Sequence, residues 1–171
     1  MQVMRDPVAE TFLSFSVRRM QMSERDLNRC LDRLTEEQAW RRGAEHENSV
    51  GNLLLHLEGN LRQWVLHGIA GQPDVRVRDE EFSLAPTVTF AEARAHFHAT
   101  LSECCVVIGE LAPARLLEII DPQPTGTWRS MPILEAIYQI VGHLQLHTGQ
   151  VILLTKQMCG TDLDLSLPRK R

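Results

Sequence analysis

The chain has 171 residues, of which 43% are hydrophobic, and its formal net charge is −4. This length is typical of one domain with a substantial core, so we interpret residues 1–171 as a single domain. The acidic balance argues against nucleic-acid binding, which normally requires a basic surface. No apolar run is long enough to cross a membrane, and residues 1–10 lack the apolar core of a signal peptide. We therefore expect a cytoplasmic protein with neither a membrane nor a nucleic-acid partner.

The sequence contains four cysteines, Cys30, Cys104, Cys105 and Cys159, and no CxxC pair. They lie in apolar segments with helical spacing. We interpret them as small buried hydrophobic residues in a reducing compartment. The alternative, a redox or nucleophilic role for Cys104 or Cys105, stays open at this point.

Apolar residues recur at helical spacing along most of the chain, and no convincing alternating strand pattern is present. We predict a first helix over residues 7–34. A short helical turn follows, because residues 35–38 have the capping-box sequence Thr-Glu-Glu-Gln. Asn48 or Ser49 can cap a second helix, which continues to the residue before Gly71.

A long connection over residues 72–88 separates the second helix from the third. It contains two prolines and several charged residues, and it is too long for a tight antiparallel hairpin. We therefore expect it to cross the end or the side of a helical bundle. Thr89 begins the third helix with another capping box. This helix ends near Leu111, before Pro113.

After a turn-rich loop over residues 121–126, Ser130 or Met131 starts the fourth helix, with Pro132 just inside it. This helix continues to Cys159, where the following glycine stops it. The predicted fold class is therefore all-α, a four-helix bundle with a long crossover between helices 2 and 3.

Three histidines, His56, His143 and His147, lie in the strongly apolar segments 50–71 and 131–158. His143 and His147 are four residues apart, about one helical turn, so their imidazoles project from the same helix face. Two imidazoles from one helix and a third from a neighbouring helix can form a three-nitrogen metal site with open coordination positions. This pattern is typical of catalytic metal centres, whereas structural zinc sites usually have four ligands and favour cysteine.

Each of the two segments carries a neutral polar strip that is separate from the charged face of its helix. The strip around His56 contains Asn52, Asn60, Gln63 and His67. The strip around His143 contains Gln139, His147 and Gln150. Two such strips that face each other would form a polar pocket inside the bundle, which is how metal sites in bundles are built.

The alternative interpretation is that these histidines are surface residues or hydrogen-bonded core residues. The other histidines have weaker claims, because His67 lies too far from His56 to bind the same ion, and His96 and His98 diverge on their helix. Trp128, in the loop before the fourth helix, is interpreted as a packing residue, and the alternative is a roof over the pocket.

Residues 49–64 read SVGNLLLHLEGNLRQW, and residues 142–151 read GHLQLHTGQV. In these motifs and in the order of its helices the chain resembles DinB/YfiT-like proteins, and the resemblance covers essentially the whole domain. It implies a four-helix bundle with up-down-down-up topology and a homodimer. It also implies a divalent metal ion held by three histidines, which correspond here to His56, His143 and His147.

The first functional hypothesis is a divalent-metal-dependent enzyme that acts on a small molecule. The resemblance implies a thiol-dependent S-transferase, with a low-molecular-weight thiol as a further cofactor, or a hydrolase. Zinc, nickel, iron or manganese would suit three imidazoles and would activate a thiolate or a water molecule. Asn52, Asn60 and Gln150 are candidates to orient ligands or substrate around the metal. The strips contain no clear carboxylate general base, since Glu135 lies to one side.

The second hypothesis is a non-catalytic metal-binding or dimeric stress-response protein, whose metal would be buried without an adjacent cavity. A third is a helical bundle without a metal, in which the histidine strips are hydrogen-bonded core groups. The sequence identifies neither the metal nor the substrate.

Overall fold

The computed structural model describes residues 6–123 and 130–165. Its secondary structure is almost entirely helical, which confirms the predicted all-α class. In the described residues the α-helices are α1 (Pro7–Leu31), α2 (Glu36–Trp40), α3 (Val50–Leu61), α4 (Phe90–Gly109) and α5 (Ile133–Cys159). The shorter elements are a π-helix η1 (Arg62–His67), the 3-10 helices η2 (Arg78–Phe82) and η3 (Pro113–Leu117), and the strands β1 (Ile119–Ile120) and β2 (Met131–Pro132). Trp128 and the second half of the predicted loop at residues 121–126 lie outside the described residues.

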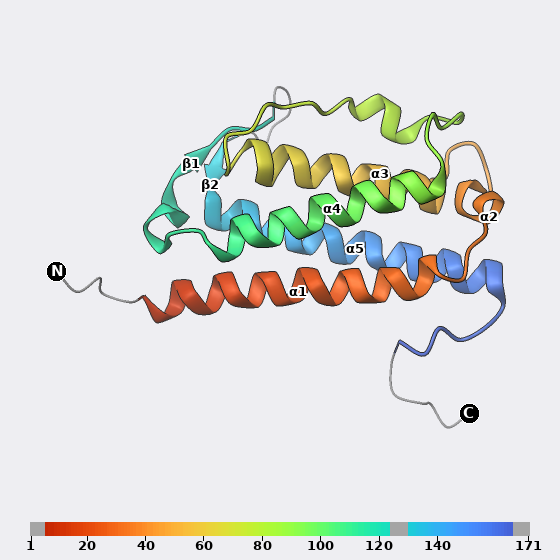
Figure 1. The fold of residues 1–171 in the computed structure, drawn as a ribbon, viewed down its shortest axis with the longest axis horizontal. Helices are drawn as coiled ribbons and strands as arrows, with labels where there is room; N and C mark the ends of the chain where they lie inside the picture. Colours follow the sequence, from red (N-terminus) through yellow and green to blue (C-terminus); the bar gives the residue numbers. More distant parts are fainter. Residues whose placement is uncertain (1–5, 124–129, 166–171) are drawn as a thin grey trace.

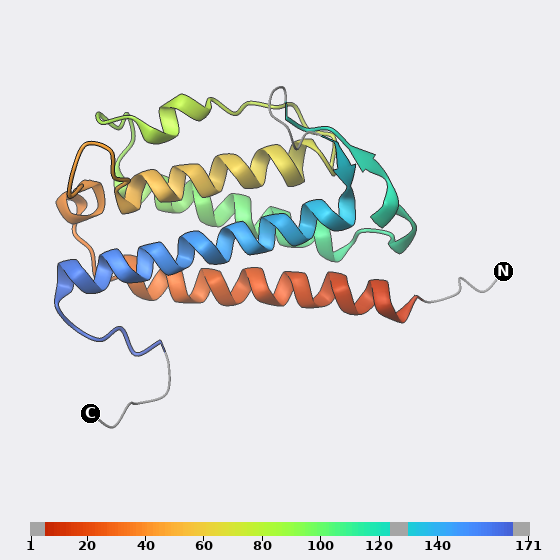
Figure 2. The ribbon, with the colours of Figure 1, turned by 180° about the vertical axis from the view of Figure 1, so that it is seen from behind.

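The four long helices α1, α3, α4 and α5 lie side by side along the longest axis of the molecule (Figures 1 and 2). Helices α1 and α3 each pack against both α4 and α5. Figure 1 shows that α1 and α5 run in one direction and that α3 and α4 run in the opposite direction. The short α2 lies at the end of the molecule where the chain passes from α1 to α3.

The predicted capping boxes at Thr35, Ser49 and Thr89 are confirmed. Each of these side chains accepts a hydrogen bond from the backbone N–H three residues later, and the side chain at that position accepts one from the cap residue. Two otherwise unpaired backbone donors are thereby satisfied at each helix start. At the C-terminal end of α5, Gly160 adopts a left-handed conformation with φ of 64°, as expected for a glycine that ends a helix.

Several predicted boundaries were wrong. Helix α1 ends at Leu31, three residues before the predicted end, and the second helix changes to π-helical geometry after Leu61 and ends at His67. Pro132 precedes α5 instead of lying inside it, because Met131 and Pro132 pair with β1 in an antiparallel ladder. Strands of two residues are too short to produce an alternating sequence pattern, so this ladder was not predicted.

The connection over residues 72–88 runs back along the length of α3 (Figure 1). Its 3-10 helix η2 packs directly against α3. Of the two courses expected for this segment, across the end or along the side of the helices, the structure has the one along the side. Glu81, near the end of η2, is only 6% exposed, although most of its neighbours in the segment are exposed.

The hydrophobic core lies between the four long helices. Its largest fully buried side chains include Met20, Leu27, Leu53, Leu57, Phe97, Leu101, Ile108 and Ile133. Among the described residues, no helix combines the length and the apolar character that a membrane crossing requires. Of the four cysteines, all with free thiols, Cys30 and Cys104 are buried as predicted, whereas Cys105 and Cys159 are half-buried.

Candidate metal centre

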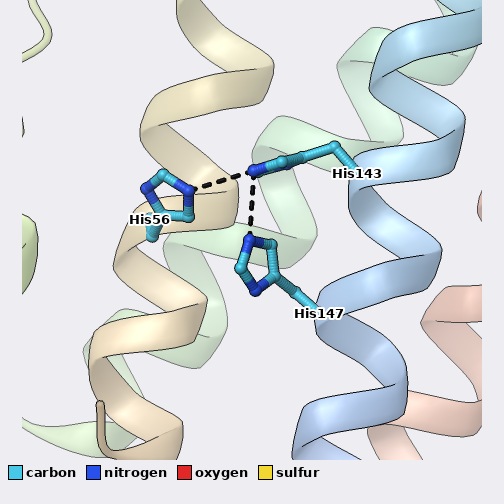
Figure 3. Close-up of side chains that lie close together, drawn as sticks. All are labelled: His56, His143 and His147. Atoms are coloured by element: carbon cyan, nitrogen blue, oxygen red, sulfur yellow. Dashed lines mark hydrogen bonds between the residues drawn. The ribbon is translucent and has the colours of Figure 1, made fainter. Parts of the chain in front are cut away.

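Helices α3 and α5 bring the three predicted histidines together (Figure 3). His56 projects from α3, and His143 and His147 project from consecutive turns of α5. The Nε2 atom of His143 lies 3.0 Å from Nε2 of His56 and 3.1 Å from Nε2 of His147. One ring nitrogen from each of the three histidines lies within 4.8 Å of the others. The two distances to Nε2 of His143 are close to those between imidazole nitrogens that share a metal ion at about 2.0–2.1 Å.

The outward-facing nitrogens of two of these rings are held by acceptors. Nδ1 of His56 lies 2.8 Å from Oε2 of Glu81, and Nδ1 of His147 lies 2.6 Å from Oε1 of Gln150. An ionised carboxylate and an amide oxygen can only accept a hydrogen bond, so each Nδ1 carries the proton and donates it outward. The Nε2 atoms of His56 and His147 therefore present lone pairs to the centre of the cluster, as metal ligation requires.

His143 lies between the other two rings, and its Nε2 takes part in both short contacts. A neutral imidazole has one N–H, so His143 can donate to one neighbour at most, and the other contact then brings two electronegative nitrogens together with no proton directed between them. A cation at the centre removes this repulsion. The residues present therefore fit a metal ion. The buried Nδ1 of His143 has no hydrogen-bond partner among the described residues, so ligation through Nε2 would leave the outer proton of this ring without an acceptor there.

Burial favours the neutral form of the imidazoles of His143 and His147. Burial, together with the neighbouring rings of His147 and His56, lowers the pKa of His143 to about 3. Burial also lowers the pKa of His147, although its hydrogen bond to Gln150 acts in the opposite direction. Neutral imidazole is the form that binds a metal, so both side chains are prepared for ligation at neutral pH.

Glu81 joins the crossover segment to His56 through a buried ion pair. Nε and Nη2 of Arg76 donate to the two carboxylate oxygens of Glu81, at 2.6 and 2.9 Å, and the Arg76 side chain is only 5% exposed. Burial raises the pKa of Glu81, but the hydrogen bonds from Arg76 and His56 outweigh burial, so this pKa lies below its ordinary value. Arg76 also donates to Gln63, whose amide donates in turn to Asp74. Glu81 is therefore an ionised carboxylate that fixes the ring of His56.

Gly59 makes room on α3 for this ion pair. A Cβ atom on Gly59 would clash with Oε1 of Glu81 and would lie 3.1 Å from Nε of Arg76. A glycine inside a helix costs about 1 kcal/mol relative to alanine. The close approach of Glu81 and Arg76 provides a reason for a glycine at this position.

Asn52, on α3, holds the crossover segment through the backbone of Glu81. Its amide nitrogen donates to the backbone carbonyl of Glu81 at 2.9 Å, and its amide oxygen accepts from Arg42 at 2.7 Å. Arg42 donates in addition to the backbone carbonyls of Phe82 and Ser83. Asn52 therefore acts on the histidines through the position of Glu81, and it is not among the residues that line the cleft described next.

A cleft of about 700 Å³ opens beside the histidines. The described residues that line it are His56, Asn60, Trp64, Arg76, Arg78, Gln123, Met131, Leu134, Glu135, Tyr138, Gln139, Ile140 and His143. His56 and His143 line the cleft and His147 does not, so the histidine cluster borders the cleft through the first two rings. Its volume is in the range of small-molecule sites.

A family model described as "Protein of unknown function (DUF1572)" matches residues 7–171. The chain belongs to the DUF1572 family. In the comparison with curated proteins, no sequence match was found. The family match includes all three histidines and the whole crossover segment of this DUF1572 chain.

The predicted site residues of this DUF1572 chain have three different positions. Asn60 lines the cleft, Gln150 contacts His147, and Asn52 contacts the crossover segment. Sequence reasoning missed Glu81 and Arg76, which were treated as part of a charged connection. A glycine inside the predicted second helix, Gly59, was the available signal, because such a glycine often marks the close approach of another segment.

Proposed function

We propose that this DUF1572 protein is a divalent-metal-dependent enzyme that acts on a small molecule, as an S-transferase or a hydrolase. The observation that carries the proposal is the convergence of three Nε2 atoms at the wall of a cleft of about 700 Å³. Three imidazoles with an open side are the donor set typical of catalytic metal centres. The identity of the metal would depend on availability among zinc, nickel, iron and manganese.

A divalent ion at this position would lower the pKa of a thiol or a water molecule and so supply a nucleophile near neutral pH. The side chains of the protein would position the reaction around it. Glu81 and Gln150 orient the rings of His56 and His147, and Asn60 and Gln139 present amides that can hydrogen-bond a substrate in the cleft. Glu81 is not available as a general base, because both of its oxygens are occupied by Arg76 and His56.

We also infer kinship with DinB/YfiT-like proteins, with a four-helix bundle of up-down-down-up topology and a homodimeric assembly. The opposite directions of the α1/α5 and α3/α4 pairs support this topology, as does the long crossover between α3 and α4. A histidine set contributed by the second and the last long helix is in keeping with the same kinship.

The alternative of a non-catalytic metal-binding or stress-response protein predicts a metal enclosed by protein. The cleft beside His56 and His143 supports the enzyme over this alternative, because a substrate could reach the open side of the ion. The alternative of a bundle without a metal must tolerate a close contact between two ring nitrogens at His143 with no proton directed between them, which also supports the metal-dependent proposal.

The test begins with elemental analysis of protein purified without an affinity tag. The wild type should contain close to one metal ion per chain, and His143→Ala should contain almost none. His96→Ala is the matched control, because His96 is exposed on α4 and lies outside the cluster. Metal in equal amounts in the wild type and His143→Ala would contradict the proposed site.

The metal-loaded wild type should then be assayed for conjugation of small thiols to an electrophile such as monochlorobimane, and for hydrolysis of activated esters. Activity that follows metal content across the three proteins supports the enzyme. A fully loaded protein without either activity would favour the non-catalytic alternative.

A further inference from the structure

The cleft contains a cationic side chain that the Glu81 network does not use. Arg78 lines the cleft from the exposed surface of η2, two residues beyond Arg76. Its guanidinium carbon lies 5.2 Å from the centre of the Phe82 ring. Within residues 6–123 and 130–165, no group accepts a hydrogen bond from Arg78 or forms an ion pair with it. The N–H groups of this guanidinium are therefore available to a ligand in the cleft.

Phe82 connects Arg78 to the histidine cluster. The Phe82 ring lies 5.0 Å from the ring of His56, measured between ring centres, and Arg78 stacks on the same phenyl ring. Stacking on an aromatic ring restrains a guanidinium and leaves its N–H edge free to bind a planar anion through two parallel hydrogen bonds. One aromatic side chain thus separates the free cation from a candidate metal ligand.

The remaining side chains of the cleft indicate which kind of ligand would fit between Arg78 and the histidine cluster. Glu135 is the acidic residue among the described lining residues, and it lies in the first turn of α5, where the helix N-terminus stabilises a carboxylate. The side chains of Met131, Leu134 and Ile140 are apolar, and the amides of Asn60 and Gln139 are neutral. The cleft therefore offers a cation at one position, histidine ligands at another, and an apolar wall.

We propose that Arg78 binds the carboxylate of a small substrate whose other end reaches the metal ion held by the histidines. A carboxylate matches the fork of a single guanidinium, whereas a doubly charged phosphate generally requires more donors than one arginine and neutral amides supply. The inference rests on the proposed function, because it requires a metal at the three histidines. It adds a substrate class, a short-chain carboxylate with a metal-binding group, and a residue that selects it.

The test uses the cobalt(II)-loaded protein and two thiol probes, 3-mercaptopropionate and 3-mercaptopropionamide. The probes differ in their carboxylate and amide groups, and binding of either thiolate to cobalt produces a charge-transfer absorption band that gives its affinity. The quantity of interest is the ratio of the acid affinity to the amide affinity. Comparing this ratio between protein variants cancels the intrinsic difference between the two thiols.

In Arg78→Gln the ratio should fall about fivefold at low ionic strength, as expected for one partly exposed ion pair with two hydrogen bonds. The difference from the wild type should shrink as salt is added, because salt screens exposed charges. Arg41→Gln is the matched control, since it removes the same charge from the end of α2, outside the cleft, and should leave the ratio unchanged.

The outcomes separate this inference from the proposed function. A wild type that binds no cobalt would overturn both. Cobalt binding with an unchanged ratio in Arg78→Gln, or with an equal fall in Arg41→Gln, would overturn the role of Arg78 alone. A cobalt protein that gives no thiolate band with either probe would also overturn the inference, and the metal site would still stand.

Discussion

Oε2 of Glu81 lies 2.8 Å from Nδ1 of His56, so a residue of the crossover segment fixes a candidate metal ligand on α3. The contact spans 25 positions of the sequence and is buried. Glu81 holds the proton of His56 on the outward nitrogen, and Arg76 keeps Glu81 ionised. The crossover segment is therefore part of the site as well as a connection between two helices.

Replacing Glu81 should weaken metal binding and destabilise the fold. Glu81→Gln keeps an acceptor for His56 but leaves the buried Arg76 without its counter-charge. Removal of one partner from a buried ion pair typically costs about 3–5 kcal/mol. Loss of a carboxylate that supports a metal-binding histidine typically weakens metal affinity about 10–100-fold. Zinc titration by calorimetry and urea unfolding measure the two effects separately.

Glu80→Gln is the control for this variant, because the neighbouring Glu80 is exposed and the carboxylate that accepts from His56 is that of Glu81. It should have the metal affinity and the stability of the wild type. Wild-type zinc affinity in Glu81→Gln would show that Glu81 supports the fold only.

Gly59→Ala should be destabilising although alanine favours helices. The added methyl group would displace the Glu81 carboxylate and Arg76 from α3, so we expect a loss of about 1–3 kcal/mol together with weaker zinc binding. Gly149→Ala, at an open position on α5, should instead stabilise the protein by up to about 1 kcal/mol. Thermal unfolding of both variants measures these opposite effects. Equal melting temperatures for Gly59→Ala and Gly149→Ala would argue against the close packing at Gly59.

The metal-free protein should lose stability as the pH falls below about 6.5. Burial lowers the pKa of His143 from 6.5 to about 3 in the folded state. Between these values the unfolded chain binds a proton that the folded chain does not, so the free energy of unfolding decreases as the pH decreases. Above 6.5 His143 contributes nothing to this dependence.

Urea unfolding of chelator-treated protein at about pH 7, 6 and 5.5 measures the slope while most carboxyl groups remain ionised. His143→Gln should reduce the slope, and the part due to His147 should remain, because burial lowers its pKa too. An identical slope in the wild type and His143→Gln would show that His143 is accessible to protons in the folded state.

The cysteines should be poor nucleophiles. Burial raises the pKa values of Cys30 and Cys105 to about 11, and it raises that of Cys104 as well. Almost no thiolate is then present at neutral pH, so Cys104 should react with iodoacetamide only after unfolding. Rapid labelling of Cys104 in the native protein, located by mass spectrometry, would restore the alternative of a reactive thiol.

Metal binding should stabilise the folded chain. Zinc at about 1,000 times its dissociation constant adds about 4 kcal/mol, since the folded state alone assembles the three ligands. The melting temperature should rise with zinc, fall again with a chelator, and stay unchanged in His147→Ala. A zinc-induced rise of equal size in His147→Ala would place the zinc elsewhere.

The sequence by itself determined the features that depend on neighbouring residues. The capping boxes and the shared face of His143 and His147 follow from a helical period of about 3.6 residues, which depends only on local geometry. The pairing of these residues with His56 was predicted from matching polar strips and from the resemblance, and α3 and α5 do bring the three rings together. Local periodicity thus predicted the helices, and together with the resemblance it predicted the histidine cluster.

Only the tertiary structure decided what surrounds the cluster. Glu81, Arg76 and Arg78 lie in a connection without periodicity, so their partners depend on how residues 72–88 dock against α3. The cleft has the same origin, because most of its described lining residues come from α3, the crossover segment and α5. Docking of this kind results from many weak long-range contacts and from the space left at Gly59, which no local pattern records.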